Sequence, residues 1–259
     1  MKILFLGTGA ADWKNKPECE IEGDERRWSS VLLDRHILID VSPQSYDFAK
    51  KIGVDVSKIT DLFITHTHLD HYCKDTLMNF RKETDVKINI YCHSKAVEKL
   101  GLSDEKMGKF NIFPLEDKNS FEFGNGYKVT ALSANHIVAG SEETALHYIF
   151  EKNDKSLFYG CDGGWFTAST WEYIRKLSFD KIVLDATVGD KDGDFRLGTH
   201  NSIPMLRLIV AAMKENKMLN ENCTIIASHL ARTLHTSREE TERIFKEFGM
   251  LVAYDGVEF

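Results

Sequence analysis

Phe63-Ile64-Thr65-His66-Thr67-His68-Leu69-Asp70-His71 places three imidazoles and one carboxylate within six residues, directly after an apolar run. The preceding residues, Asp61 to Ile64, are typical of a short buried strand, and Asp75 to Lys82 are typical of a helix. The cluster therefore follows a strand and precedes a helix, at the sheet edge where layered α/β proteins bind ligands. So dense a cluster has little use except to hold metal.

The spacing within the cluster indicates two ions. His66 and His68 are two residues apart in an extended segment, so their side chains project to the same side. Asp70 and His71 follow at the turn and can face a second ion. A single histidine near a strand end is usually a hydrogen-bonded core or surface residue, but four ligand-type residues in this order favour metal binding.

The order His66-x-His68-x-Asp70-His71 resembles the signature of the metallo-β-lactamase superfamily of hydrolases. The resemblance extends from Gly7 to His229. It implies an α/β fold, the four-layer αββα metallo-β-lactamase sandwich, as a single domain over residues 1–259. In the same family, a Gly-rich turn like Gly7-Thr8-Gly9 lines the active-site region.

The resemblance also implies further ligands where later strands end. His136 matches the next metal histidine, Asp162 in an Asp-Gly context matches a carboxylate that bridges the two ions, and Ser228-His229-Leu230 resembles the last metal segment. Asp40 ends an apolar run, and we expect it to orient a ligand imidazole; a strand-end cap is the alternative. The expected ligands are His66, His68 and His136 for one ion, Asp70, His71 and His229 for the other, and Asp162 between them.

Two neighbouring ions lower the pKa of a bridging water towards neutrality, and the resulting hydroxide can attack a phosphoryl or carbonyl centre. Imidazole and carboxylate ligands suit Zn²⁺, but they also accept Mn²⁺, Fe or Co²⁺. The candidate catalytic residues are Asp70, His200 and His235. A histidine just outside the metal ligands would give the leaving group its proton. His200 resembles a Gly-His element of the phosphodiesterase branch, from which the inserted Thr199 departs, and His235 is the competing candidate.

The sequence thus predicts a metal-dependent phosphodiesterase that acts on a small cyclic or nucleotide-like diester. A lactonase or thioesterase with the same site is one alternative, and a non-catalytic metal-binding accessory protein is another. The resemblance to the carbon–phosphorus lyase accessory phosphodiesterase is weakened because only Cys19 remains where that branch often has a cysteine-based zinc site. The chain also resembles ribonuclease Z more broadly, but its sequence has no long arm segment for tRNA.

Composition restricts the partners. The formal charge of −7 over 259 residues makes nucleic acid an unfavourable partner and leaves an anionic small molecule as the expected substrate, with a homodimer possible. Five cysteines without C-x-x-C spacing fit reduced thiols in the cytoplasm. No apolar run approaches the roughly 20 residues that span a bilayer. Residues 12–28 are polar and predict a long loop, in which Arg26 and Arg27 are expected to be solvated, with contact to an anionic substrate as the alternative.

Overall fold

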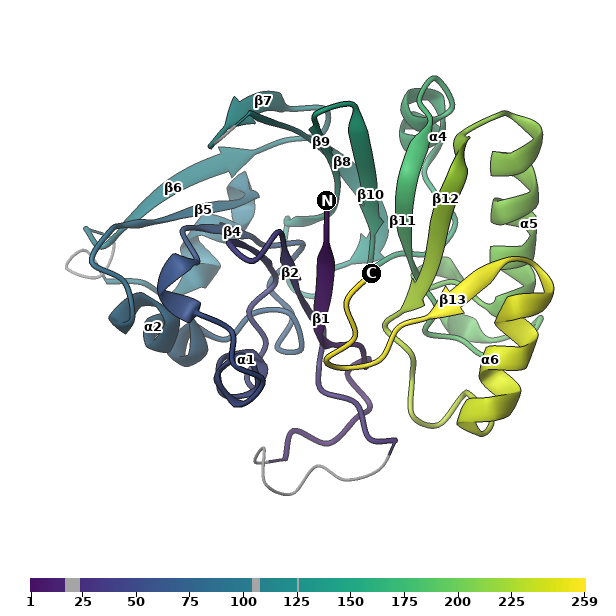
Figure 1. Cartoon of the computed structure of the whole chain (residues 1–259), viewed down its shortest axis with the longest axis horizontal. Helices are drawn as coiled ribbons and strands as arrows, with labels where there is room; N and C mark the ends of the chain where they lie inside the picture. The colour runs from purple at the N-terminus through teal and green to yellow at the C-terminus, as the bar shows by residue number, and fades with distance from the viewer. Residues whose placement is uncertain (17–23, 104–107, 125) are drawn as a thin grey trace. The chain divides into compact units, whose positions relative to one another are not determined.

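A computed structural model of the chain describes residues 1–16, 24–103, 108–124 and 126–259 (Figure 1). It contains two compact units, which we describe separately. The N-terminal unit comprises residues 2–115, 138–144 and 254–259, and the C-terminal unit comprises residue 1 with 116–137 and 145–253. Cys19 and the centre of the predicted long loop, residues 17–23, lie outside the described residues.

The described part of the N-terminal unit contains a six-stranded sheet whose strands follow sequence order. The first three strands pair antiparallel, and the third to the sixth pair parallel. Short apolar runs form these strands, because both faces of most of them are buried. The strands are β1 (Ile3–Gly7), β2 (Ser30–Leu33), β3 (Ile37–Ile39), β4 (Asp61–Phe63), β5 (Ile88–His93) and β6 (Phe110–Leu115).

Helices provide the apolar partner of this sheet. Phe48 of α1 (Ser45–Lys51) and Phe80 of α2 (Lys74–Lys82) share one core cluster with strand residues such as Leu62. The two helices contact each other, as Figure 1 shows, and the Tyr46 and Phe80 rings meet edge to face at 5.2 Å. The short 3₁₀ helices η2 (Val56–Lys58) and η3 (Ser94–Leu100) complete this side. This packing fixes the start of α2, and therefore the loop that carries the histidine cluster.

The C-terminal segment of the chain covers the edge strand β1. Ile3 donates its amide to the carbonyl of Phe259 and Phe5 donates to Val257, at 3.0 Å in both cases. Gly7 makes a close approach possible on the other side of β1, since a Cβ at this position would lie 1.8 Å from the carbonyl oxygen of Trp28.

The two arginines of the predicted loop do not meet solvent. Arg27 pairs with Asp255 at 3.1 Å and lies over the Phe48 ring, while Arg26 donates to the hydroxyl of Thr8 at 2.6 Å. Both arginines are buried. The favoured interpretation of these arginines as solvated residues was wrong, and their burial also opposes contact with an anionic substrate. Asp255 binds Arg27 from a segment more than 200 residues away, and such long-range pairing leaves no local pattern in the sequence.

The described part of the C-terminal unit contains a seven-stranded sheet in the order β13-β12-β11-β10-β9-β8-β7. The strands β10 to β13 run parallel, whereas β9 pairs antiparallel with β10, and β7 with β8. The bounds are β7 (Ser120–Phe123), β8 (Tyr127–Ile137), β9 (Thr144–Lys152), β10 (Lys155–Gly160), β11 (Phe179–Asp185), β12 (Leu219–Ser228) and β13 (Met250–Val252).

Side-chain caps begin the helices of this unit. Ser202 accepts from the amide of Met205 at the start of α5 (Ile203–Glu215), and Ser237 accepts from Glu240 at the start of α6 (Arg238–Glu247). In Figure 1, α6 lies beside β13, which it contacts. The helix α4 (Ala168–Ile174) contacts β8, and η4 (Phe195–Gly198) precedes α5. No helix in the described ranges is both long and apolar enough to cross a membrane.

Several boundaries differ from the predicted ones. The strand β8 continues to Ile137, because buried Leu132 and Ala134 alternate with half-buried Ser133 and Asn135. His136 therefore lies within a strand rather than after it. The strand predicted over Asp61 to Ile64 ends at Phe63, and the helix predicted over Asp75 to Lys82 begins at Lys74.

Candidate metal centre

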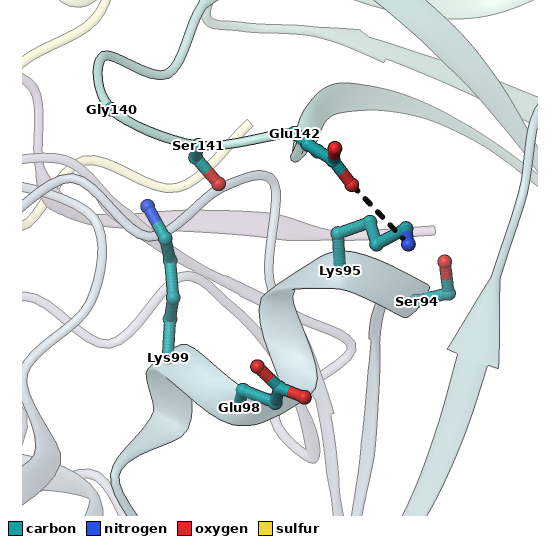
Figure 2. A pocket seen from close by; sticks show the side chains of 7 residues that line it. All are labelled: Ser94, Lys95, Glu98, Lys99, Gly140, Ser141 and Glu142. Atoms are coloured by element: carbon teal, nitrogen blue, oxygen red, sulfur yellow. Dashed lines mark ion pairs between the residues drawn. The ribbon is translucent and has the colours of Figure 1, made fainter.

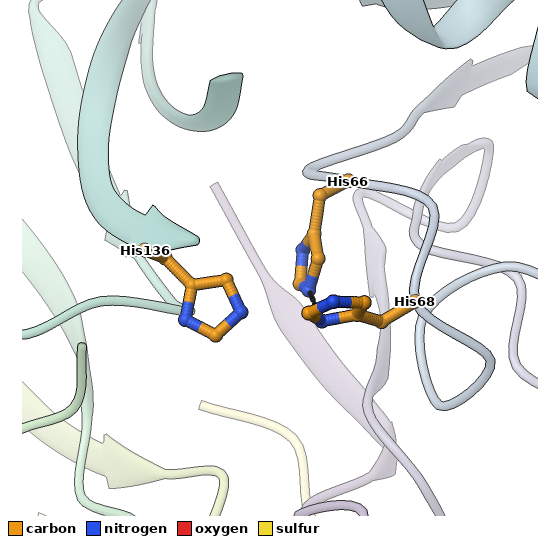
Figure 3. A group of neighbouring side chains, drawn as sticks. All are labelled: His66, His68 and His136. Carbon is orange, nitrogen blue, oxygen red and sulfur yellow. Dashed lines mark hydrogen bonds between the residues drawn. The ribbon is translucent and has the colours of Figure 1, made fainter. Parts of the chain in front are cut away.

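The histidine cluster of the N-terminal unit lies on the loop between β4 and α2. His66 and His71 are fully buried, and the Nε2 atom of His66 is 2.9 Å from the Nδ1 atom of His68. Figure 3 shows these two rings directed towards each other. The Nε2 atom of His71 lies 3.6 Å from a carboxylate oxygen of Asp70. This unit therefore gathers four of the predicted ligands in one loop.

The carboxylate of Asp40 contacts two residues of this loop. Its Oδ2 atom lies 2.7 Å from Nδ1 of His71, and its Oδ1 atom accepts from the amide of Thr65 at 2.7 Å. The Thr65 hydroxyl, which also bonds to Asp40, is 3.1 Å from Nδ1 of His66. Burial raises the pKa of Asp40, and the contacts with His71 and Thr65 oppose this effect. These contacts are the ones that the predicted orienting role of Asp40 requires.

A second cluster lies in the C-terminal unit, where the parallel strands β10, β11 and β12 end at the same edge of the sheet. Asp162 follows β10, Asp185 ends β11, and His229 follows β12. His200 joins them from the segment before α5. The potential ligand atoms of these four residues all lie within 4.8 Å of one another.

Asp162 is the centre of this second cluster. It is 2% exposed, and its oxygens lie 3.3 Å from Nδ1 of His229 and 3.8 Å from Nε2 of His136. Although burial alone would raise the pKa of Asp162, the imidazoles of His229, His200 and His136 lower it well below its ordinary value. The structure thus brings Asp162, His136 and His229 together within one unit, with His136 at the end of β8 that Figure 3 shows.

His200 lies between two carboxylates. Its Nδ1 atom is 2.9 Å from Asp162 and 2.8 Å from Asp185. Burial would lower the pKa of His200, but these two carboxylates raise it to about 11. The competing candidate, His235, instead donates from Nε2 to the carbonyl of Ala186 at 2.7 Å and stacks on Phe245. Its ring is thus held by the backbone of its own unit.

Sequence reasoning missed two residues that hold this cluster, Asp185 and Thr187. Asp185 contacts His200 and accepts from the amide of Gly163, and the Thr187 hydroxyl lies 2.8 Å from Nδ1 of His229. His147 is a buried, packed side chain whose ring contacts Phe158, and it also donates from Nε2 to the carbonyl of Asp162 at 3.1 Å. Burial lowers the pKa of His147 to about 4. Asp185 could have been found from the sequence, because it is a carboxylate at the end of an apolar strand, and Asp162 lies two residues after another such strand.

The donors of both clusters fit a divalent cation. Each unit supplies buried imidazoles and carboxylates, which Zn²⁺ and related ions accept. One ring nitrogen of most of these histidines already contacts an oxygen: Nδ1 of His71 meets Asp40, Nδ1 of His136 meets the carbonyl of Thr199, and Nδ1 of His229 meets Thr187. Such contacts fix the ring so that the other nitrogen can bind metal.

Known proteins resemble this chain over nearly its full length. Ribonuclease Z from Pyrococcus furiosus is 24% identical over 268 residues, which cover 95% of this chain and 82% of that protein. The solved structure of a diphosphatase from the PhnP family has a TM-score of 0.74 at 21% identity, with 100% of this chain and 96% of the other covered. Zn²⁺-bound PqqB from Methylobacterium extorquens has a TM-score of 0.71 at 17% identity, with 100% and 99% covered.

The family comparison agrees with the two-sheet architecture and with the histidine signature. A family model described as the beta-lactamase superfamily domain matches residues 35–220, which is more than half of the chain. The predicted fold class is confirmed. The chain belongs to the beta-lactamase superfamily and has the metallo-β-lactamase fold.

Proposed function

We propose that this protein is a dinuclear metal-dependent phosphodiesterase that acts on a small phosphodiester. The two clusters would act as one site, with His66, His68 and His136 on one ion, Asp70, His71 and His229 on the other, and Asp162 bridging them. The observation that carries the proposal is the position of His200, a histidine held between two carboxylates within the ligand cluster of the C-terminal unit. Zn²⁺ is the expected metal, and Mn²⁺ and Fe are alternatives.

The bound ions would supply an activated water and neutralise charge on the phosphoryl oxygens. The protein's own contribution is the proton for the leaving alkoxide. Because His200 contacts both carboxylates through Nδ1, proton transfer would use its Nε2 atom. Asp185 holds the His200 ring with Nδ1 towards the carboxylates, and the charges of Asp162 and Asp185 raise the pKa of His200.

The choice of a phosphodiester has support from the relatives. The name ribonuclease Z describes an enzyme that cleaves RNA, and the PhnP-family structure is described as a diphosphatase. A small substrate is preferred because the chain carries a formal charge of −7, which opposes the approach of a polyanion. RNA cleavage is the second candidate function, favoured by the similarity to ribonuclease Z. A cytoplasmic location and a homodimer also stay predictions.

The test is a substrate comparison at fixed metal loading. Protein loaded with Zn²⁺ or Mn²⁺ is assayed with bis(p-nitrophenyl) phosphate, cyclic and linear nucleotide diesters, a single-stranded RNA, lactones and thioesters. We expect the small diesters to give the highest kcat/KM and His66→Ala to abolish their hydrolysis. Faster turnover of RNA would favour the second candidate, and faster turnover of lactones or thioesters would indicate a different hydrolase. Full metal content with no hydrolysis of any substrate would indicate an accessory protein.

A further inference from the structure

A buried acidic side chain contacts the residue between the first two histidine ligands. The Thr67 hydroxyl donates to Oε2 of Glu143 at 2.5 Å, and both residues belong to the N-terminal unit. Thr67 separates His66 from His68, and none of these three residues lies in a helix or strand. A change in the backbone of Thr67 would therefore move both imidazoles.

Glu143 is an unusual residue in this position. It is 6% exposed, and its Oε1 atom is buried without a hydrogen-bond partner in the part of the chain that the structure describes. Burial raises the pKa of Glu143, while the hydrogen bond with Thr67 and the ammonium group of Lys99 oppose this effect. A buried acidic group with one unpartnered oxygen destabilises a fold. A role in positioning the ligand loop gives a reason for its presence.

The segment that carries Glu143 is itself fixed. The amide of Glu143 donates to the Ser141 hydroxyl at 3.0 Å. The amide of Thr144 donates to Nδ1 of His93, the last residue of the buried strand β5. Glu142 pairs with Lys95 at 3.4 Å, as Figure 2 shows. This segment and η3 together line a surface cavity of about 470 Å³, formed by Ser94, Lys95, Glu98, Lys99, Gly140, Ser141 and Glu142.

We propose that Glu143 is a positioning residue for the metal ligands of the N-terminal unit. Through the Thr67 hydroxyl it holds the backbone that joins His66 to His68, so that both imidazoles are directed to one ion before metal arrives. This inference rests on the proposed function only in taking His66 and His68 as ligands. Fixed ligands bind more tightly because less conformational freedom is lost when the ion binds.

The test measures metal affinity by competition with a chromogenic chelator and records the absorption spectrum of the Co²⁺-substituted protein. We expect Glu143→Ala and Thr67→Val each to weaken metal binding about 10- to 100-fold, the range for residues that orient ligands. Both should alter the Co²⁺ spectrum. Thr67→Ser keeps the hydroxyl and should bind metal like the unchanged protein. The double variant should be no weaker than the weaker single variant, because both changes remove the same hydrogen bond.

Glu142→Ala is the matched control, since this neighbouring glutamate is exposed and pairs with Lys95. It should leave metal affinity unchanged. If Glu143→Ala fails to fold, the comparison of Thr67→Val with Thr67→Ser decides the question. Unchanged affinity and spectrum in Thr67→Val would overturn the inference and leave the proposed function standing. Tight metal binding by the unchanged protein without hydrolysis of any substrate would overturn the proposed function and leave the inference about Glu143 standing.

Discussion

Asp40 and His229 adopt left-handed backbone conformations, with φ angles of 60° and 59°. Such angles are uncommon for residues other than glycine, and they cost about 1–3 kcal/mol unless the surroundings compensate. In both residues the side chain contacts the candidate metal centre of its own unit. At each position the left-handed turn directs a polar side chain from the end of a buried strand into the cluster.

Replacement of Asp40 tests this arrangement. Asparagine also tolerates the left-handed conformation, but its amide group cannot accept from both Thr65 and His71. We expect Asp40→Asn to weaken metal binding about 10- to 100-fold, measured by chelator competition. Asp154→Asn is the control, because Asp154 is exposed and has a similar φ of 57°. Equal metal affinity in the two variants would contradict the orienting role of Asp40.

The two candidate proton donors differ in what their replacement should do. His200→Ala should lower kcat about 10²- to 10⁴-fold for a diester with an alkyl leaving group, because that alkoxide needs a proton. The loss should be much smaller for a p-nitrophenolate leaving group, which departs without one. His235→Ala should instead lower the unfolding temperature and change the two kcat values equally. The measurement is kcat for both substrates in both variants, and a reversed pattern would identify His235 as the donor.

At the scale of the element, the core face of α5 allows a paired stability test. Ile209 is fully buried and its neighbour Leu208 is 63% exposed. We expect Ile209→Ala to lower the free energy of unfolding by about 2–5 kcal/mol, because it leaves a cavity and removes buried apolar surface. Leu208→Ala should change it by less than about 0.5 kcal/mol. Urea unfolding of both variants measures the difference, and equal effects would mean that α5 packs on a different face.

Elements with local signals were predictable from the sequence, and those without them were not. The apolar spacing after Ser202 and the capping pair of Ser237 with Glu240 are local signals for the starts of α5 and α6. The strand β13 has only three residues and depends on pairing with β12, which no local pattern reports. In the site, the histidine signature was evident, but the Glu143 contact joins residues 76 positions apart.

At the scale of the whole molecule, the proposed dinuclear centre predicts that bound metal stabilises the folded chain. An ion that binds only the folded protein stabilises it by about 2.7 kcal/mol at 100 times its Kd. We expect a chelator to lower the unfolding temperature of the unchanged protein. His66→Ala and Asp162→Ala, one from each unit, should each lose most of this metal-dependent difference.

His36→Gln supplies the control for these two variants, because His36 lies in a turn where its ring meets the carbonyl of Asp34. It should keep the full response to metal. A normal response in Asp162→Ala, with two ions still bound by mass spectrometry, would contradict a bridging carboxylate shared by both clusters.

The pairing of β1 with residues 257–259 has a consequence for synthesis on the ribosome. The strand β1 cannot obtain this partner until residues 257–259 have also been translated, which takes on the order of 10 to 50 s at about 5–20 residues per second. During that time one edge of β1 carries open amide and carbonyl groups, which invite association with other nascent chains. Arrival of residues 257–259 would close this edge and bring Asp255 to Arg27 in the same step.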